Sequence, residues 1–326
     1  MHKHRKLLIL AVLVIVAAGA TVFIYQRLAG SPEAARLLPE GDFLIYANLK
    51  PAHLFDLSKS GPVELEGDYK DFVAQTGIQF ERDLDEVAMS RRDTPDHTDV
   101  ESSEVFIGRF DAERLKNYLQ KVSDSTEQYR NHTIYSIAHE GHRVRATLLD
   151  RDKVAVTNMQ SPELMHGIID RAYKSTSGPS LLHAHYRDVP ATSLAWLIYR
   201  IPNKPDNVQL PGGLAFTFPA DTIAVGSLRY TGATVLLRAD VFAQSESQAR
   251  QIVDSANNHL ALVRSIGNWV GTRGSNKDVK AAFESIQVEQ KENVALFTAT
   301  IPQSMLKKLW SEAQAENAAP APEQNR

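Results

Sequence analysis

An apolar run from Leu7 to Tyr25 constrains this chain more than any other feature. It holds no charged side chain and follows a short basic segment, residues 1–6. A helix rises about 1.5 Å per residue, so the run extends roughly 28 Å, close to the thickness of the hydrocarbon core of a bilayer. We therefore expect a transmembrane signal-anchor helix over residues 7–25 that contacts the lipid bilayer.

Positive charge is distributed unevenly around this run. Three of residues 1–6 are Lys or Arg, and only Arg27 follows shortly after the run. The positive-inside rule keeps residues 1–6 in the cytoplasm and exports the chain from about Gln26 onward. We expect a single-pass protein of the cytoplasmic membrane whose main domain is extracytoplasmic, and periplasmic in a two-membrane envelope.

A cleavable signal peptide is the alternative interpretation of the same segment. Leu7 to Val16 would form its hydrophobic core, and Ala18 to Ala20 are small enough for signal peptidase. The apolar residues continue through Thr21 to Tyr25, where a mature N-terminus is normally polar, so we favour the anchor. Cleavage after Ala20 stays open, and both interpretations export the same domain. Lipid modification would need a cysteine, and the chain has none.

Composition excludes several classes of function. Without cysteine there are no disulfides, thiolate metal sites or thiol nucleophiles. Residues 31–326 carry 32 Lys and Arg against 39 Asp and Glu, a net charge of about −7. Such a surface repels phosphate backbones, and no basic stripe with interleaved aromatic residues compensates for it. We do not expect nucleic acid as a partner.

Two short repeats suggest an internal duplication. Leu-Ile-Tyr occurs at residues 44–46 and again at 197–199, each time in a segment bounded by prolines. Asp85 to Ser90 likewise resembles Asp221 to Ser227. In both cases another strand and then a helix follow. The repeat predicts two related halves in the exported chain.

We place the first α+β half at residues 31–188 and the second at 189–314. Residues 315–326 are small, polar and proline-bearing, which predicts a disordered tail because such a composition offers little apolar surface to bury. Strand and helix patterns alternate irregularly along both halves. They predict an α+β fold of mostly antiparallel sheets with helices packed on one face.

Capping residues and apolar periodicity locate the helices. Asp111 and Ser245 each precede a run with apolar residues at i, i+3, i+4 and i+7, and Pro162 and Pro302 each start a further helix. The segment Thr234 to Phe242 alternates as a half-buried strand should. The core-facing residues of the two capped helices are Leu115, Tyr118, Leu119, Val122, Ala249, Ile252, Val253, Ala256, Leu260 and Val263.

Three segments give the exported chain a family likeness: Tyr69 to Gly77, Phe80 to Ala88, and Gly108 to Asp111 before a helix. In these segments the chain resembles a family of uncharacterised single-anchor bacterial envelope proteins. The resemblance covers nearly all of the exported chain and implies its location and fold. The family has no assigned activity, so the resemblance carries over no functional residues.

Histidines are the main candidate metal ligands. His139 and His142 are three residues apart, whereas the zinc-protease motif needs a spacing of four on one helical face. Gly141 between them favours a hairpin turn with solvated rings. His183 and His185 would share a face only in an extended segment, and a helical or irregular segment is the alternative. We expect no metal at either pair.

Other motifs are weaker still. The acidic run from Glu81 to Glu86 could serve glycoside hydrolysis or bind calcium, but a solvated helix end or turn before a strand explains it better. No serine-nucleophile elbow occurs. Pro211 to Gly213 lacks the ending of a phosphate loop, so nucleotide binding is not expected. Asn131 begins a glycosylation sequon. Trp269 lies in a predicted loop between two helices, where it packs or contacts a partner.

These patterns identify no catalytic, cofactor-binding or metal-ligating residue. We therefore expect a non-enzymatic, membrane-anchored extracytoplasmic protein that binds or scaffolds another envelope protein. One alternative is an envelope hydrolase with a non-local Asp, Glu or His site. Another is an accessory subunit of a transport or secretion complex, which would need a membrane partner because six cytoplasmic residues cannot signal alone.

Overall fold

The computed structural model describes residues 30–51, 67–93, 100–139, 141–174, 178–201, 206–210, 214–232, 234–269 and 277–305. The predicted cytoplasmic segment (1–6), anchor (7–25) and tail (315–326) lie outside these ranges. Within them, no helix combines the length and apolar character needed to cross a membrane.

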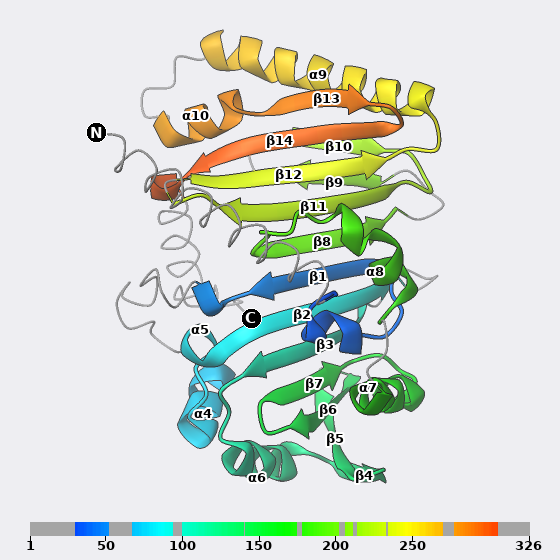
Figure 1. The fold of residues 1–326 in the computed structure, drawn as a ribbon. Coiled ribbons are helices and arrows are strands. Elements are labelled where there is room, and N and C mark those ends of the chain that lie inside the picture. The colour runs from blue at the N-terminus through cyan, green and yellow to red at the C-terminus, as the bar shows by residue number, and fades with distance from the viewer. Residues whose placement is uncertain are drawn as a thin grey trace, which may run out of the picture.

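A continuous antiparallel sheet of 12 strands forms the centre of the described chain (Figure 1). The strand order is β13-β14-β12-β11-β8-β1-β2-β3-β7-β6-β5-β4, and β9 pairs with β10 in a separate hairpin. The predicted α+β class with antiparallel strands is confirmed. The strands are β1 (Phe43–Asn48), β2 (Leu84–Asp93), β3 (Val100–Gly108), β4 (Ser125–Tyr129), β5 (His132–His139), β6 (His142–Asp150), β7 (Lys153–Thr157), β8 (Ala195–Arg200), β9 (Asp206–Leu210), β10 (Leu214–Phe218), β11 (Ile223–Tyr230), β12 (Thr234–Phe242), β13 (Gln287–Lys291) and β14 (Val294–Pro302).

Helices α6 (Ala112–Val122) and α9 (Glu246–Trp269) begin after the N-cap residues that the sequence predicts. The Asp111 carboxylate accepts a hydrogen bond from the backbone N–H of Arg114 at 3.1 Å, and the Ser245 hydroxyl accepts one from the N–H of Gln248 at 3.2 Å. Both are N-cap contacts. The helices are α2 (Glu33–Leu37), α4 (Gly67–Thr76), α5 (Phe80–Asp83), α6 (Ala112–Val122), α7 (Pro162–Lys174), α8 (Ser180–His185), the 3-10 helix η2 (Tyr186–Asp188), α9 (Glu246–Trp269) and α10 (Lys277–Glu284).

Two helix ends differ from expectation. Trp269 is the last residue of α9 rather than part of a loop, because the helical pattern of α9 continues past Leu260. Pro302 ends β14, and the helical residues described after it start at 303. Proline at this strand end pairs with Thr234, at the start of β12, where the missing N–H is least costly.

Both halves of the chain share an order of five strands, and the first half adds β5 and β4 at its outer edge. The first runs β1-β2-β3 and returns to β3 through β6 and β7, while the second runs β8-β11-β12 and returns to β12 through β13 and β14. α6 and α9 make the equivalent connections. The halves meet where β1 pairs with β8, so one sheet crosses the boundary that the sequence predicts near residue 189. This order is consistent with duplication.

The repeated Leu-Ile-Tyr tripeptides are not equivalent in the sheet. Tyr46 pairs with Trp196 and is buried, whereas Tyr199 pairs with Phe43 and lies on the opposite face, against the core of α9. Strand side chains alternate between faces, so a one-residue offset reverses every side chain. The strand order therefore supports duplication, whereas the Leu-Ile-Tyr identity is offset by one residue between the two halves.

The sheet has two distinct apolar faces. The front face carries Leu44, Tyr46, Trp196 and Ile198, which are at most 5% exposed and are covered by α2, α7 and α8 (Figure 1). The back face carries two separate cores near the sheet ends, one under α6 and one under α9. Helices therefore pack on both faces, beyond the single covered face that the sequence predicts, because α6 and α7 bury alternate residues of the same strands.

Candidate functional site

The predicted hairpin around His139 and His142 is confirmed. The two residues pair across the end of β5 and β6, both side chains are exposed, and Gly141 has the left-handed φ of 82° that a tight turn requires. Glu140 lies outside the described residues. Across the described part of the chain, no three His, Asp or Glu side chains are arranged to hold a metal ion.

The second histidine pair lies on a helix. His183 and His185 both belong to α8, where a spacing of two turns side chains by about 200° around the axis. His183 is exposed, and the His185 Nδ1 lies 3.1 Å from Asp188 Oδ2. The two imidazoles therefore do not share a face.

The acidic run from Glu81 to Glu86 has a structural role. It forms the short helix α5 and enters β2, as predicted, but Asp83 is buried rather than solvated. Arg82 donates to both of its carboxylate oxygens at 2.8 and 2.7 Å. Burial disfavours the charged form of Asp83, but the hydrogen bonds from Arg82 and the Gln79 N–H, with the positive charge of Arg82 and Arg109, hold its pKa below the ordinary value.

A basic recess lies beside His142, at the hairpin that the sequence analysis considered as a possible metal site. Its cavity volume is about 300 Å³, and it lies beside the segment between β7 and α7. Its lining residues are Gly141, His142, Arg143, Arg145, Asn158 and Gln160. We call this the hairpin recess.

Two hydrogen bonds between backbone N–H groups and side-chain oxygens position the far wall of the hairpin recess. The Asn158 side chain accepts from the Ser102 N–H at 2.6 Å, and the Gln160 N–H donates to Glu101 at 3.2 Å. Met159, between them, is fully buried. Strand β3 thus fixes a segment that follows it by more than 50 residues in the chain.

Arg145 supplies the floor of the hairpin recess. Its Nη1 and Nη2 donate to the carbonyls of Met159 and Gln160 at 2.8 and 3.2 Å. Burial, followed by the like charge of Arg143, lowers the pKa of Arg145, and Glu127 opposes that shift. Arg145 therefore donates to backbone carbonyls, and no carboxylate of the described residues lies at hydrogen-bond distance from it.

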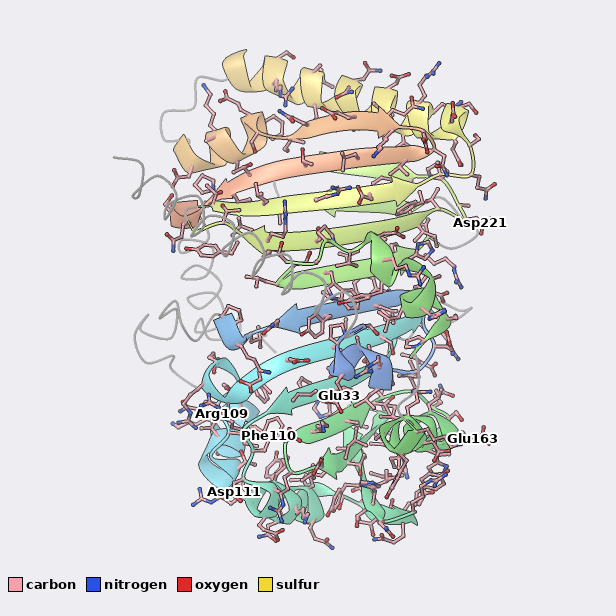
Figure 2. The ribbon with its side chains drawn as sticks, in the orientation of Figure 1. Glu33, Arg109, Phe110, Asp111, Glu163 and Asp221 are labelled. Carbon is pink, nitrogen blue, oxygen red and sulfur yellow. The ribbon has the colours of Figure 1, made fainter. Side chains whose placement is uncertain are left out.

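Arg143 lies two residues earlier on the same face of β6 and is exposed. Among the described residues it makes no ion pair or hydrogen bond. Two acids lie nearby: Glu127 contacts His166 at 2.7 Å, and Glu101 accepts from the Gln160 backbone N–H at 3.2 Å. Glu163, in the first turn of α7, projects outward from the molecule (Figure 2). Among the described residues, the lining of the hairpin recess therefore carries two guanidinium groups and no carboxylate.

The sequence identified the hairpin but not the recess. Two arginines at i and i+2 beside a predicted turn were the only local signal. Asn158 and Gln160 reach the same place because β7 pairs with β6 and ends beside it. Strand pairing brings these distant residues together, so no local motif in the sequence predicts this wall of the recess.

The structure describes some of the remaining residues that the sequence analysis named, and others lie outside the described chain. Asn131 is exposed at the tip of the β4–β5 hairpin. Phe43 and Trp196 pack in the sheet as expected, with Trp196 stacked on Tyr46 at 5.4 Å. Residues 211–213 lie outside the described chain, and the strand predicted after them is β10.

Comparison with known proteins adds little. The chain matches no protein-family model, and no curated protein sequence matches it. Among solved structures, crystal forms I, III and IV of TP0453 are 11% identical over 86 to 87% of this chain and 97 to 99% of theirs, with TM-scores of 0.44 to 0.45. The similarity is therefore distant in sequence and in backbone.

Proposed function

We propose that this protein is a membrane-anchored, extracytoplasmic binding or scaffolding module. The apolar run of residues 7–25 supports the anchor, and the asymmetry of positive charge around it supports export. The hairpin recess supports binding. In this proposal the recess contacts an anionic group on another component of the cell envelope.

One observation carries the binding role: Arg143 and Arg145 share a recess whose described lining residues include no carboxylate. Guanidinium groups are usually paired when they lie together, because like charges destabilise the fold. Arg82, Arg130 and Arg238 each contact an aspartate in this protein. An anionic partner would give Arg143 the negative charge and the hydrogen-bond acceptors that those aspartates give the other arginines.

Site-specific cross-linking in intact membranes tests the proposal. A photo-reactive benzoylphenylalanine replaces His142, which lines the recess while leaving both arginines in place. We expect one reproducible, stoichiometric envelope component to be captured, and we expect Arg143→Asp to abolish the capture. The matched control places the same probe at the exposed Glu289 on β13, at the opposite edge of the sheet.

Different outcomes separate the alternatives. Capture that is equal from positions 142 and 289, or unchanged by Arg143→Asp, would contradict binding through the recess. Capture of the core of a transport or secretion complex would instead favour the accessory-subunit interpretation. Release of the protein by alkaline carbonate, with no change on deleting residues 7–25, would contradict the anchor.

A further inference from the structure

We infer that the hairpin recess binds a doubly charged oxyanion of the phosphate type, an inference that rests on the binding role proposed above. It narrows the ligand from any anionic group to one chemical class. Its basis is the number, type and spacing of the donors around the recess.

The side chains around the recess have more hydrogen-bond donors than the described protein groups accept. Arg145 commits two N–H groups to the Met159 and Gln160 carbonyls and retains three of its five. Arg143 commits none to a partner within the described chain. The Gln160 side chain is exposed and also makes no contact there, so its amide adds two donors. These groups can donate together to an acceptor with several oxygens.

Charge distinguishes among possible ligands. A metal cation is repelled by two guanidinium groups, so the histidine of this hairpin does not lie in a cation site. A carboxylate carries one charge and two oxygens, which one guanidinium satisfies in a bidentate pair. A phosphate group carries more charge and three or more acceptor oxygens, and can contact both Arg143 and Arg145. The pair therefore favours the doubly charged anion.

Size indicates how much of a ligand the recess holds. A volume of about 300 Å³ lies at the small end of the range for ligand pockets, roughly 300 to 1,000 Å³. The recess therefore accommodates a phosphate group and the first atoms attached to it. Inorganic phosphate and a phosphate monoester share this chemistry.

Calorimetric titration of the full-length protein in detergent tests the inference at constant ionic strength. The probes are inorganic phosphate, glycerol phosphate and acetate. We expect both phosphates to bind at least about tenfold more tightly than acetate, since charge-assisted hydrogen bonds to the extra oxygens add to affinity. Tighter binding of glycerol phosphate would identify an ester as the ligand, and tighter binding of inorganic phosphate would identify the free ion.

Variants assign the binding to this recess. Arg143→Ala should weaken phosphate at least about tenfold and Arg143→Asp should abolish it, because the second change installs a competing carboxylate. Lys116→Ala, at an exposed cation on α6, should change nothing. Cooperative melting at or above the temperature of the parent protein would show that the variants fold.

Two results would overturn the inference: acetate binding as tightly as phosphate, or phosphate binding that survives Arg143→Asp. If phosphate fails to bind while the probe at position 142 still captures a partner in an Arg143-dependent manner, this inference falls and the proposed function stands. If both experiments fail, both fall.

Discussion

Two pairs of side chains on the front face of the sheet have the same i, i+2 spacing and opposite outcomes. On β12, Arg238 donates to both oxygens of Asp240 at 3.0 and 3.1 Å, and Asp240 is only 5% exposed. On β6, Arg143 and Arg145 carry like charges beside a recess. In the first pair, each side chain neutralises the charge of the other. In the second pair, N–H donors remain without a described protein acceptor.

A third pair, on the back face of β3, lies between these extremes. The Ser102 hydroxyl donates to Glu104 at 3.3 Å, but no cation pairs with this half-buried carboxylate in the described chain. The three pairs show that strand spacing only brings two side chains together. The identity of the partner decides whether the pair stabilises the fold, destabilises it or binds a ligand.

Breaking the complete pair should have the largest effect. Asp240→Asn leaves Arg238 without its carboxylate beside a buried amide. We expect a loss of about 2 kcal/mol in the free energy of unfolding, below the value for a fully buried pair because the Arg238 side chain is 45% exposed. Urea denaturation measures it. Lys280→Ala, at an exposed helical pair, should cost almost nothing, and equal losses in both variants would contradict the distinction.

Replacing Arg145, which forms the floor of the hairpin recess, should reduce stability by less. Arg145→Met deletes the hydrogen bonds to the Met159 and Gln160 carbonyls but also removes the repulsion from Arg143. We expect a net loss of about 1.5 kcal/mol. Arg143→Met, which loses no such contact, should stay within about 0.5 kcal/mol of the parent protein. Urea denaturation in phosphate-free buffer compares the two, and a larger loss for Arg143→Met would reverse our assignment of roles.

The Ser102 and Glu104 pair on β3 predicts that the stability of the protein depends on pH. Burial raises the pKa of Glu104, and the Ser102 hydroxyl only partly offsets it. The unfolded chain therefore ionises first, and stability falls as pH rises from the ordinary value toward the folded one. Glu104→Gln should then stabilise the protein by about 1 kcal/mol at pH 7.

This gain should disappear below about pH 4, the ordinary range of a glutamate, where the parent residue is protonated in both states. Thermal melting at a series of pH values measures the difference between the two proteins. The same gain at low and neutral pH would mean that packing, rather than charge, explains the variant.

Converting one pair into the other should have the smallest effect on stability. Arg143→Asp gives β6 the acid and base that β12 already has, so we expect a gain of about 0.5 kcal/mol, as for exposed ion pairs. Added salt should reduce that gain. A clear loss of stability, measured by urea denaturation, would show that Arg143 has a structural partner.

Much of the local structure could be predicted. Capping groups fixed the starts of α6 and α9, Pro162 fixed the start of α7, and Gly141 indicated the hairpin, because each acts through neighbours within four residues. The burial of Asp240 was missed, since alternation alone assigns a charged residue to the exposed side.

The sequence by itself determined the α+β class, the starts of α6, α7 and α9, the absence of cysteine chemistry and the expectation of an exported, anchored domain. Only the tertiary structure decided that both halves share one sheet, that Tyr46 and Tyr199 face opposite ways, and that Arg143 and Arg145 meet Asn158 and Gln160 in a recess. The physical reason is distance along the chain: capping is local, whereas strand register joins residues far apart in sequence and shifts every side chain with it.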